Sequence, residues 1–456
     1  KTSQSKGDDN LFETVGYDSI DNLFETAGYD SIDNLFDESG EGKGEEKRDK
    51  GGILEKIKDY IPKLMDNGSE KNQFVQENET FTLKIEEICD ENDIDYSAGF
   101  ASSEIYLKQL FSEHDKVNST VFTQVFSFLI NTGFDSKIDV QQKQIKYISE
   151  IMKTENIAFV CSHKSYLDLV ILFIILERYE LPLPYIFSGI NLDLPGIGDF
   201  VRKTGIIFIK RSVKDDPLYK FILKYYIDIL MEKNAHFMWS IEGERTRTGK
   251  LLDPKLGIIK YMQNSDKKVK YIPVSISYDI IPDLDDFYNE INGKKKKSEN
   301  ISWLFDYFNN ISKKNLGQIY IRFGETLPDI SNEEVLARRA IREIDNVSCI
   351  TTISLICNSL LNFYSLNKTG LKVILLELIK HTDRFASNDL EIEDNIQRSL
   401  NLLLQSDIIK TNEEDLNSNY IFRRDKIYQV IYYSNNSAHL FYPLVFLELG
   451  LMKIRK

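Results

Sequence analysis

Apolar residues recur along this chain in two patterns, and the change from one to the other divides the sequence into regions. From residue 53 to about residue 154 they follow a spacing of three and four, as at Leu107, Leu110 and Phe111, which is typical of helices. Short continuous apolar runs replace that spacing between residues 155 and 330. The helical spacing returns from about residue 331. We therefore expect helical regions at 53–154 and 331–456 on either side of a different core.

The middle region alternates short apolar runs with longer amphipathic segments. Strands are expected at 157–161, 184–187, 205–209, 236–241, 269–277 and 318–323. Helices are expected after Ser165, near 197–203 and at 218–232. Strands that alternate with helices indicate a parallel sheet. The expected fold class is therefore α/β, with a largely parallel sheet flanked by helices and with N-terminal and C-terminal helical regions.

The first 52 residues have a different character. A twelve-residue repeat, DNLFETVGYDSI and then DNLFETAGYDSI, fills residues 9–32, and a glycine-rich charged segment follows at 40–52. Residues 1–50 hold 14 acidic and 6 basic side chains, so they supply much of the net charge of −14. A segment of this composition buries too little apolar surface to fold alone. We expect a disordered acidic tail and linker, and tandem Leu-Phe and Tyr anchors for an unknown partner are the second interpretation.

The acidic balance also limits the classes of partner. A dedicated nucleic-acid binder needs a dense basic face, so no nucleic-acid role is expected. The longest apolar run covers only the eight residues 169–176, which is too short to span a bilayer. Peripheral association with a membrane, on the cytoplasmic side, stays open. A lysine run at Lys294 to Lys297 reads either as a solvated loop or as a contact for anionic headgroups.

Cysteine usage is sparse. Cys89, Cys161, Cys349 and Cys357 are scattered, without a CxxC motif or a histidine at metal-ligand spacing, so reduced thiols and no metal site are expected. Cys161 lies two residues before a histidine, which is compatible with a Cys/His nucleophile. Its place at the end of an apolar strand favours buried packing instead.

One histidine and one carboxylate stand where the first strand of the core ends. His163 follows the apolar run 157–161, and Asp168 comes five residues later, as an apolar helix begins. With His163 on the turn, Asp168 can reach back to the ring, fix its tautomer and stabilise the imidazolium. A histidine that caps the helix is the alternative. Ligand sites of α/β sheets lie at this end of the strands, which favours a general base.

Cations follow two further strands. Lys210 and Arg211 end the apolar strand GIIFIKR, and the segment SIEGERTRTGK follows another. Cations at the carboxyl ends of parallel strands point to the crevice where anions bind, although solvated strand ends also carry them. In the second segment Gly243 permits a close turn, Arg245 and Arg247 can clamp a phosphate, and Glu242 is expected to orient the arginines.

Together these segments resemble the glycerolipid acyltransferases, and within them the branch that acylates glycerol 3-phosphate or dihydroxyacetone phosphate. Four motif blocks occur in the family's order and spacing: HKSYLD at His163, GIIFIKR at Gly205, IEGERTRTGKLLDPK at Ile241 and YIPVSISYD at Tyr271. The resemblance covers residues 156–327 and extends more loosely to YYSNNSAHLF at Tyr432. Lys164 and Lys210 stand where the family commonly has arginine. The implied domains are a tail at 1–52, a helical region at 53–154, an acyltransferase core at 155–330 and a helical region at 331–456.

The resemblance also implies roles. His163 would take the proton of the acceptor's 1-hydroxyl and Asp168 would hold its ring, with direct attack on the acyl thioester. The implied substrate-binding residues are Lys210, Arg211, Glu242, Gly243, Arg245, Arg247 and Pro273, the last of these for the acyl donor. No cofactor is implied, since acyl-CoA or acyl carrier protein is a co-substrate. Two other functions stay open: a thioesterase that activates water with the same pair, and a non-catalytic lipid-binding scaffold.

Overall fold

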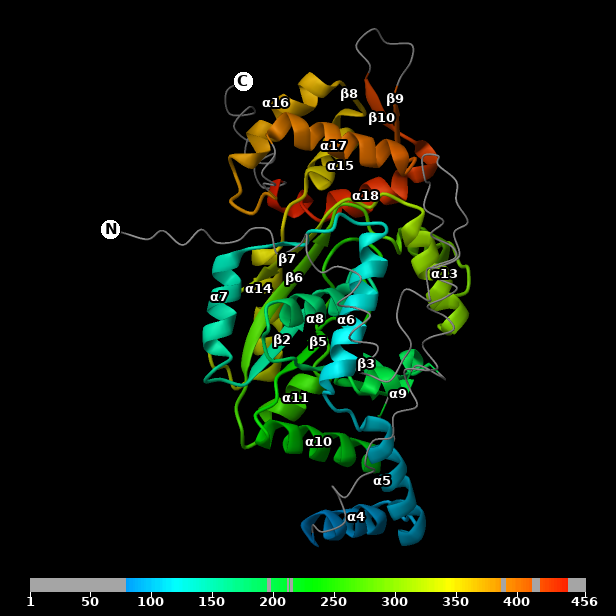
Figure 1. Ribbon diagram of the computed structural model, residues 1–456, viewed down its shortest axis with the longest axis vertical. Coiled ribbons are helices and arrows are strands. Elements are labelled where there is room, and N and C mark those ends of the chain that lie inside the picture. Colours follow the sequence, from blue (N-terminus) through cyan, green and yellow to red (C-terminus); the bar gives the residue numbers. More distant parts are fainter. Residues whose placement is uncertain are drawn as a thin grey trace, which may run out of the picture.

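A seven-stranded sheet occupies the middle of the molecule (Figure 1). Its strands lie in the order β1 (Asp139–Val140), β7 (Ile319–Phe323), β6 (Lys270–Tyr278), β2 (Ile157–Cys161), β5 (Phe237–Ser240), β3 (Tyr185–Gly189) and β4 (Ile206–Ile209). Each neighbouring pair is parallel except β6 and β7. The predicted α/β class with a largely parallel sheet is therefore confirmed, and β2, which precedes His163, lies at the centre of the sheet.

The computed structural model describes residues 79–194, 198–210, 213, 216–386, 391–411 and 419–441. Residues 1–52, where repeats and a linker were expected, and Arg211 lie outside the described residues.

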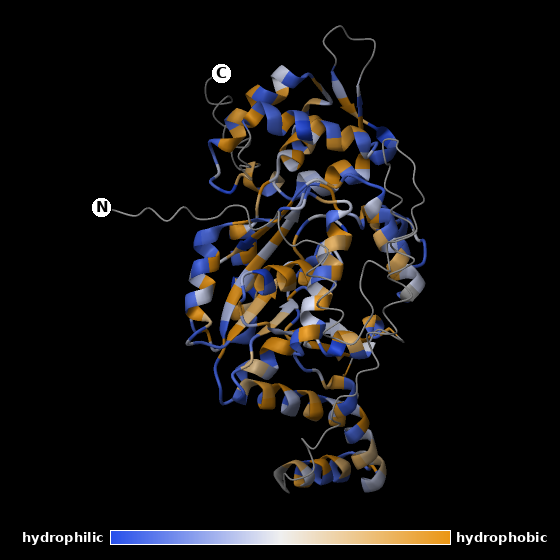
Figure 2. Cartoon of the chain, viewed as in Figure 1, coloured by the Kyte–Doolittle hydropathy of each residue, from blue (hydrophilic) through white to orange (hydrophobic). Residues whose placement is uncertain are grey.

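Helices cover both faces of the sheet, because its strands are apolar on both sides. In β2, Phe159 and Cys161 join one core cluster while Ala158 and Val160 join the other. Figure 2 shows the central strands largely in the colour of apolar residues. The first face is covered by α6 (Lys116–Asn131), α7 (Gln142–Ile151) and α8 (Asp168–Arg178). The second face is covered by α10 (Pro217–Glu232), α11 (Gly257–Gln263) and α14 (Glu333–Val347). A short helix, α9 (Gly198–Arg202), precedes β4.

Two helices extend the molecule beyond α10 (Figure 1). They are α4 (Glu79–Glu91) and α5 (Tyr96–Leu110). Asp95 caps the N-terminus of α5, where its carboxylate accepts the amide of Ala98. Buried Phe81 and Leu110 tie this pair to the second core cluster. The sequence between β6 and β7, expected as a loop-like insertion, instead forms α12 (Leu284–Ile291) and α13 (Ile301–Ser312), with the lysine run between them.

The C-terminal region forms a helical layer at the other end of the sheet (Figure 1). It contains α15 (Thr352–Phe363), α16 (Lys368–Ile379), α17 (Ile392–Gln405) and α18 (Ile427–Asn435). A small antiparallel sheet of β8 (Ser365–Leu366), β10 (Tyr420–Phe422) and β9 (Ile409–Thr411) was not expected there. These strands are too short for their alternation to stand out from the helical pattern around them. Within the described ranges, none of the helices is long and apolar enough to cross a bilayer.

Candidate active site

The turn after β2 carries the titratable pair. The Nδ1 atom of His163 lies 3.0 Å from Oδ2 of Asp168, and Asp168 is fully buried in the first turn of α8. The same oxygen accepts the amides of Lys164 and Ser165 at 2.6 and 2.9 Å, and Tyr278 donates its hydroxyl to the other oxygen. Besides its contact with His163, the Asp168 carboxylate is thus held in place by three hydrogen bonds from protein donors.

The geometry leaves one ring nitrogen of His163 available. With Nδ1 held by Asp168, Nε2 makes no hydrogen bond to any residue the structure describes, and the side chain is 22% exposed. An imidazole fixed at Nδ1 by a buried carboxylate and accessible at Nε2 is the arrangement that a general base requires.

A second buried carboxylate holds the same turn from β5. Glu242, fully buried, accepts the amide of His163 at 2.7 Å and that of Leu252 at 2.7 Å. Burial raises its pKa to about 7, and the two amide hydrogen bonds offset only part of that rise. The expectation that Glu242 orients the arginines is therefore wrong, because its carboxylate binds backbone amides instead.

Lys164 and Cys161, on either side of His163, are both buried. Burial lowers the pKa of the Lys164 ammonium, and the charges of Asp168 and Glu242 oppose that change. Burial also raises the pKa of the Cys161 thiol, so the thiolate is disfavoured. The prediction that Cys161 is a packing residue is confirmed.

Arg245 lies close to the turn, in an ion pair. Its Nη1 is 2.6 Å from Oδ1 of Asp283, which immediately precedes α12. The guanidinium lies over the ring of Tyr166, with Cζ 3.6 Å from the ring centroid. The amide of Thr246 donates to the carbonyl of His163 at 2.9 Å, so the Arg245 segment and the histidine turn are directly joined.

Arg247 is turned toward α12 and α18. Its Nη2 and Nε both bind Glu290, at 2.7 and 3.1 Å. The hydroxyl of Tyr428 donates to the carbonyl of Arg247, and Asn435 donates its amide to the carbonyl of Thr248. The segment that resembles the family's terminal signature therefore packs directly against the loop of Arg245 and Arg247.

Glycines allow this loop to turn sharply. Gly243 has φ of +72°, a left-handed conformation, and a Cβ there would lie 2.7 Å from the side chain of Lys255. Gly249 has φ of +80°, and a Cβ there would lie 2.2 Å from the carbonyl oxygen of Tyr432. The predicted close turn at Gly243 is thus present.

Lys210 is farther from this group. It follows β4, the edge strand, which is three strand positions from β2, or roughly 14 Å at the usual strand spacing. Its ammonium binds Asp216 at 3.1 Å and lies over the rings of Tyr106 and Tyr219. The structure therefore does not bring Lys210 beside His163.

Pro273 lies in β6 opposite Val160 of β2, within the sheet. Its carbonyl accepts the amide of Gly324 just beyond the β6–β7 ladder, which runs from Val274 opposite Phe323 to the far end of β6. The proline nitrogen therefore falls where no ladder donor is required. Pro273 is therefore buried within the sheet and does not lie at its edge.

Asp283 and Ser165 are the site residues that the sequence did not reveal. They are 118 positions apart and share a hydrogen bond of 2.6 Å. The apolar spacing of Leu284, Phe287 and Ile291 could have predicted α12, with Asp283 at its start. The pairing of Asp283 with Ser165 and Arg245 had no signal in the sequence.

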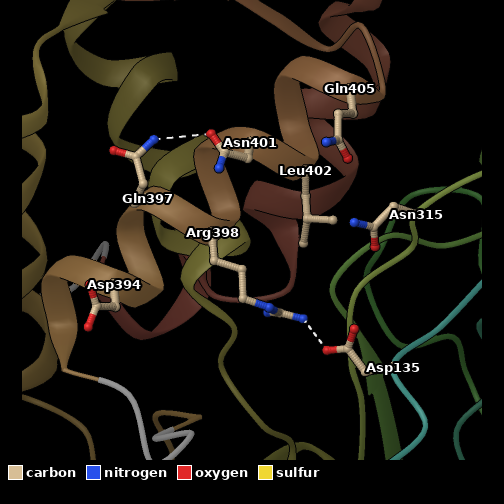
Figure 3. A pocket seen from close by; sticks show the side chains of 8 residues that line it. All are labelled: Asp135, Asn315, Asp394, Gln397, Arg398, Asn401, Leu402 and Gln405. Carbon is tan, nitrogen blue, oxygen red and sulfur yellow. Dashed lines mark hydrogen bonds and ion pairs between the residues drawn. The ribbon is translucent and has the colours of Figure 1, made fainter. Parts of the chain in front are cut away.

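A separate hollow lies away from this site. A groove of about 360 Å³ lies between α17 and the loops at Asp135 and Asn315 (Figure 3). None of its lining residues belongs to the candidate site. Among the described residues, no group of three or more His, Cys, Asp or Glu side chains is placed to hold a metal ion.

Comparison with known families gives two matches along the chain. Residues 139–277 match a family described as acyltransferase, and residues 287–455 match a family described as the glycerol-3-phosphate acyltransferase C-terminal region. The first match contains His163, Asp168 and the Arg245 loop, and the second begins within α12.

Individual relatives are similar over about half of the chain. The chain is 31% identical over 250 residues to a putative acyltransferase, PlsB1, of Mycobacterium tuberculosis and of Mycobacterium bovis, a match that covers 54% of this chain and 40% of the relative. It is 29% identical to a glycerol-3-phosphate acyltransferase of Pseudomonas entomophila, over 53% of this chain and 30% of that protein. The chain thus spans less than half the length of these curated relatives.

A solved structure also matches. The 1-acyl-sn-glycerophosphate acyltransferase PlsC of Thermotoga maritima is 16% identical, with a TM-score of 0.31, over 58% of this chain and 95% of that protein.

Proposed function

We propose that this chain, which belongs to the glycerolipid acyltransferases and within them to the glycerol-3-phosphate acyltransferase branch, transfers a fatty acyl group from an acyl thioester to the 1-hydroxyl of glycerol 3-phosphate. One observation carries the proposal. His163 is held at Nδ1 by the buried Asp168 and leaves Nε2 accessible, at the end of the central strand.

In the proposed reaction Nε2 of His163 takes the proton of the acceptor hydroxyl as its oxygen attacks the thioester carbonyl. The carbon–sulfur bond of the tetrahedral intermediate then breaks, and the imidazolium returns the proton to the departing thiolate. Asp168 stabilises the imidazolium formed between these steps. The donor is acyl-CoA or acyl carrier protein, and the reaction needs no cofactor.

The acceptor's phosphate is assigned to Arg245. Lys210 and Arg247 are each paired with a carboxylate, Asp216 and Glu290, and add positive charge only at longer range. Nε and Nη2 of Arg245 make no hydrogen bond within the described residues, so this edge of the guanidinium is available to an anion. Glu242 and Gly243 shape the loop, and the neighbourhood of Pro273 is assigned to the acyl donor.

A thiol-release assay tests the proposal, run with glycerol 3-phosphate, with dihydroxyacetone phosphate and without acceptor. Release that depends on glycerol 3-phosphate is the expected result. Preference for the ketone would assign the alternative acceptor within the same branch. Full release without acceptor would make the chain a thioesterase, and no release in any arm would leave a lipid-binding scaffold.

Peripheral membrane association is the second part of the proposal. Tyr288 and Ile291, at the end of α12, are 38% and 53% exposed, and the lysine run follows directly. Lys294 and Lys295 have no ion-pair partner among the described residues. Exposed apolar side chains beside lysines suit an anionic lipid surface, where each lysine contributes about 1 kcal/mol.

Sedimentation with vesicles tests this surface. Binding to vesicles that contain phosphatidylserine, and weaker binding to neutral vesicles, is expected. Replacing Lys294 and Lys295 by Glu should abolish the difference. The matched control replaces Lys143 and Lys146, two exposed lysines of α7, and should leave binding unchanged. Equal loss in both variants would reject this surface.

The acidic repeats are proposed as tandem anchors for a protein partner.

A further inference from the structure

Asp283 connects two parts of the site that come from different strands. Its Oδ1 binds Nη1 of Arg245, in the loop after β5, at 2.6 Å. Its Oδ2 accepts the hydroxyl of Ser165, in the turn after β2, at 2.6 Å. Tyr307 of α13 also donates to Oδ2, at 3.2 Å. A single carboxylate, 1% exposed, thus bonds to both segments.

The Arg245 end of this connection is rigid. The guanidinium is confined between the ring of Tyr166, 3.6 Å from Cζ to the centroid, and that of Phe287, 4.9 Å away. Tyr166 is itself held by a hydrogen bond to Glu299, at 2.7 Å. Asp283 binds only Nη1 of Arg245. The position of its carboxylate therefore fixes where Nε and Nη2, the free edge of the guanidinium, lie.

The Ser165 end is equally fixed, and it belongs to the turn of His163. The amide of Ser165 donates to Asp168, the same carboxylate that holds the His163 ring. The amide of Leu167 donates to the Ser165 hydroxyl at 3.2 Å. A shift of Asp283 would therefore move the turn that carries the base.

We propose that Asp283 is a positioning residue that sets the separation between Nε2 of His163 and the free edge of Arg245, and thereby selects the acceptor by the distance between its hydroxyl and its phosphate. The inference rests on the proposed function. A base and an anion clamp held by one buried carboxylate have a nearly constant spacing, so an acceptor of the wrong length cannot satisfy both. Misplacement by about 1 Å is enough to lower a rate by roughly 100-fold.

Acceptor length provides the direct test. Hydroxyalkyl phosphates of two, three and four carbons are compared in the thiol-release assay, in wild type and in Asp283→Glu, which extends the carboxylate by one methylene. Wild type should prefer three carbons by about tenfold or more, and the variant should lose or shift that preference. The donor KM should not change. An unchanged length preference in Asp283→Glu would overturn the inference.

Removing the charge gives a second test, in case the longer side chain prevents folding. Asp283→Asn should raise the acceptor KM about tenfold and lower kcat, because Arg245 loses its ion pair. Asp286→Asn is the matched control, since Asp286 lies in the first turn of α12 but is only partly buried and pairs with Lys297. Wild-type acceptor KM in Asp283→Asn would contradict the assignment.

Ser165→Ala tests the connection itself. It should lower kcat and leave the acceptor KM nearly unchanged, since it releases only the His163 end. The double variant with Asp283→Asn should have the kcat of Asp283→Asn alone, because Ser165 acts through Asp283. Multiplicative effects on kcat would show two independent residues and reject the connection.

Histidine NMR separates failure of this inference from failure of the proposed function. The chain has 5 histidines, so the His163 ring can be assigned by its loss in His163→Ala. Both Ser165→Ala and Asp283→Asn should shift the His163 ring resonances, whereas Asp286→Asn should not. The shifts are expected even if glycerol 3-phosphate is not the acceptor. Unshifted His163 resonances in both variants would reject the positioning role.

Discussion

The turn that carries His163 and the groove on α17 each have a buried carboxylate nearby but differ in chemistry. Asp168 follows β2, and Asp279 directly follows β6 and binds Arg398, a residue that lines the groove. Asp168 holds an imidazole whose second nitrogen is accessible. Asp279 holds the guanidinium of Arg398, which also binds Asp135.

The volume of a groove therefore does not indicate whether its side chains can catalyse a reaction. The groove of about 360 Å³ presents four amide side chains, and its arginine, Arg398, binds Asp135 (Figure 3). Arg398 also binds Asp279. An arginine cannot act as a base at ordinary pH, whereas a histidine can. We therefore assign chemistry to the turn and a structural role to Arg398.

His163→Ala should separate the two regions most strongly. Loss of the general base is expected to lower kcat by roughly 100- to 10,000-fold in the thiol-release assay. The thermal midpoint should stay close to that of wild type, because the ring is partly exposed. Wild-type turnover in this variant would remove the turn from the mechanism.

The pH dependence of stability should report on the turn through Glu242. Its pKa is raised by burial to about 7 in the folded state, above the usual 4.5. The unfolded chain therefore loses its proton first, and stability falls as pH rises from 4.5 to about 7, by about 3 kcal/mol at most. The free energy of unfolding, measured by denaturant titration at several pH values, should fall over this pH range in wild type but not through this group in Glu242→Gln. Parallel curves would contradict the raised pKa.

Arg398→Met should show the opposite behaviour to His163→Ala. It leaves Asp279 buried without its cation, which should cost about 2 kcal/mol of unfolding free energy, less than for a wholly buried pair because Arg398 is partly exposed. The kcat of the folded enzyme should not change. Arg338→Met, which removes an exposed pair with Glu334, should cost nearly nothing. A fall in kcat without a loss of stability would place the groove in the reaction.

Lys210→Met extends the comparison to the edge of the sheet and should have the smallest effect. Its pair with Asp216 is about 30% exposed, so the loss of stability should be below about 1 kcal/mol. The acceptor KM should rise only a few-fold. A rise above about 100-fold, with stability unchanged, would show that Lys210 binds the phosphate directly despite its distance from β2.

The sequence predicted those parts of the fold that depend on local pattern. The strand at Ile157–Cys161 and the helix at Pro217–Glu232 follow from apolar runs and spacing, and the structure confirms them. The contact between His163, on the turn after β2, and Asp168, at the start of α8, was also predicted, because the two residues are close in sequence. Their catalytic roles remain predictions.

Contacts between distant segments could not be predicted in this way. Asp283 meets Ser165 only because β2 and β6 are neighbours in the sheet, a pairing that no local pattern encodes. The lysine run concealed α12 and α13, because a charged segment reads as a loop. Lys210 was expected in the site because β4 ends like β2, but strand order, which sets its distance, cannot be read from the strand itself.

The contact between α18 and the Arg245 loop has a practical consequence for dissecting the protein. The carbonyls of Arg247 and Thr248 are bound by Tyr428 and Asn435, and Gly249 lies against Tyr432. A fragment truncated after the central sheet would expose these carbonyls to water and lose the support beneath the loop. The two regions matched by separate families thus pack as one unit, and a fragment that ends after β7 should keep the sheet but lose the fixed conformation of the Arg245 loop.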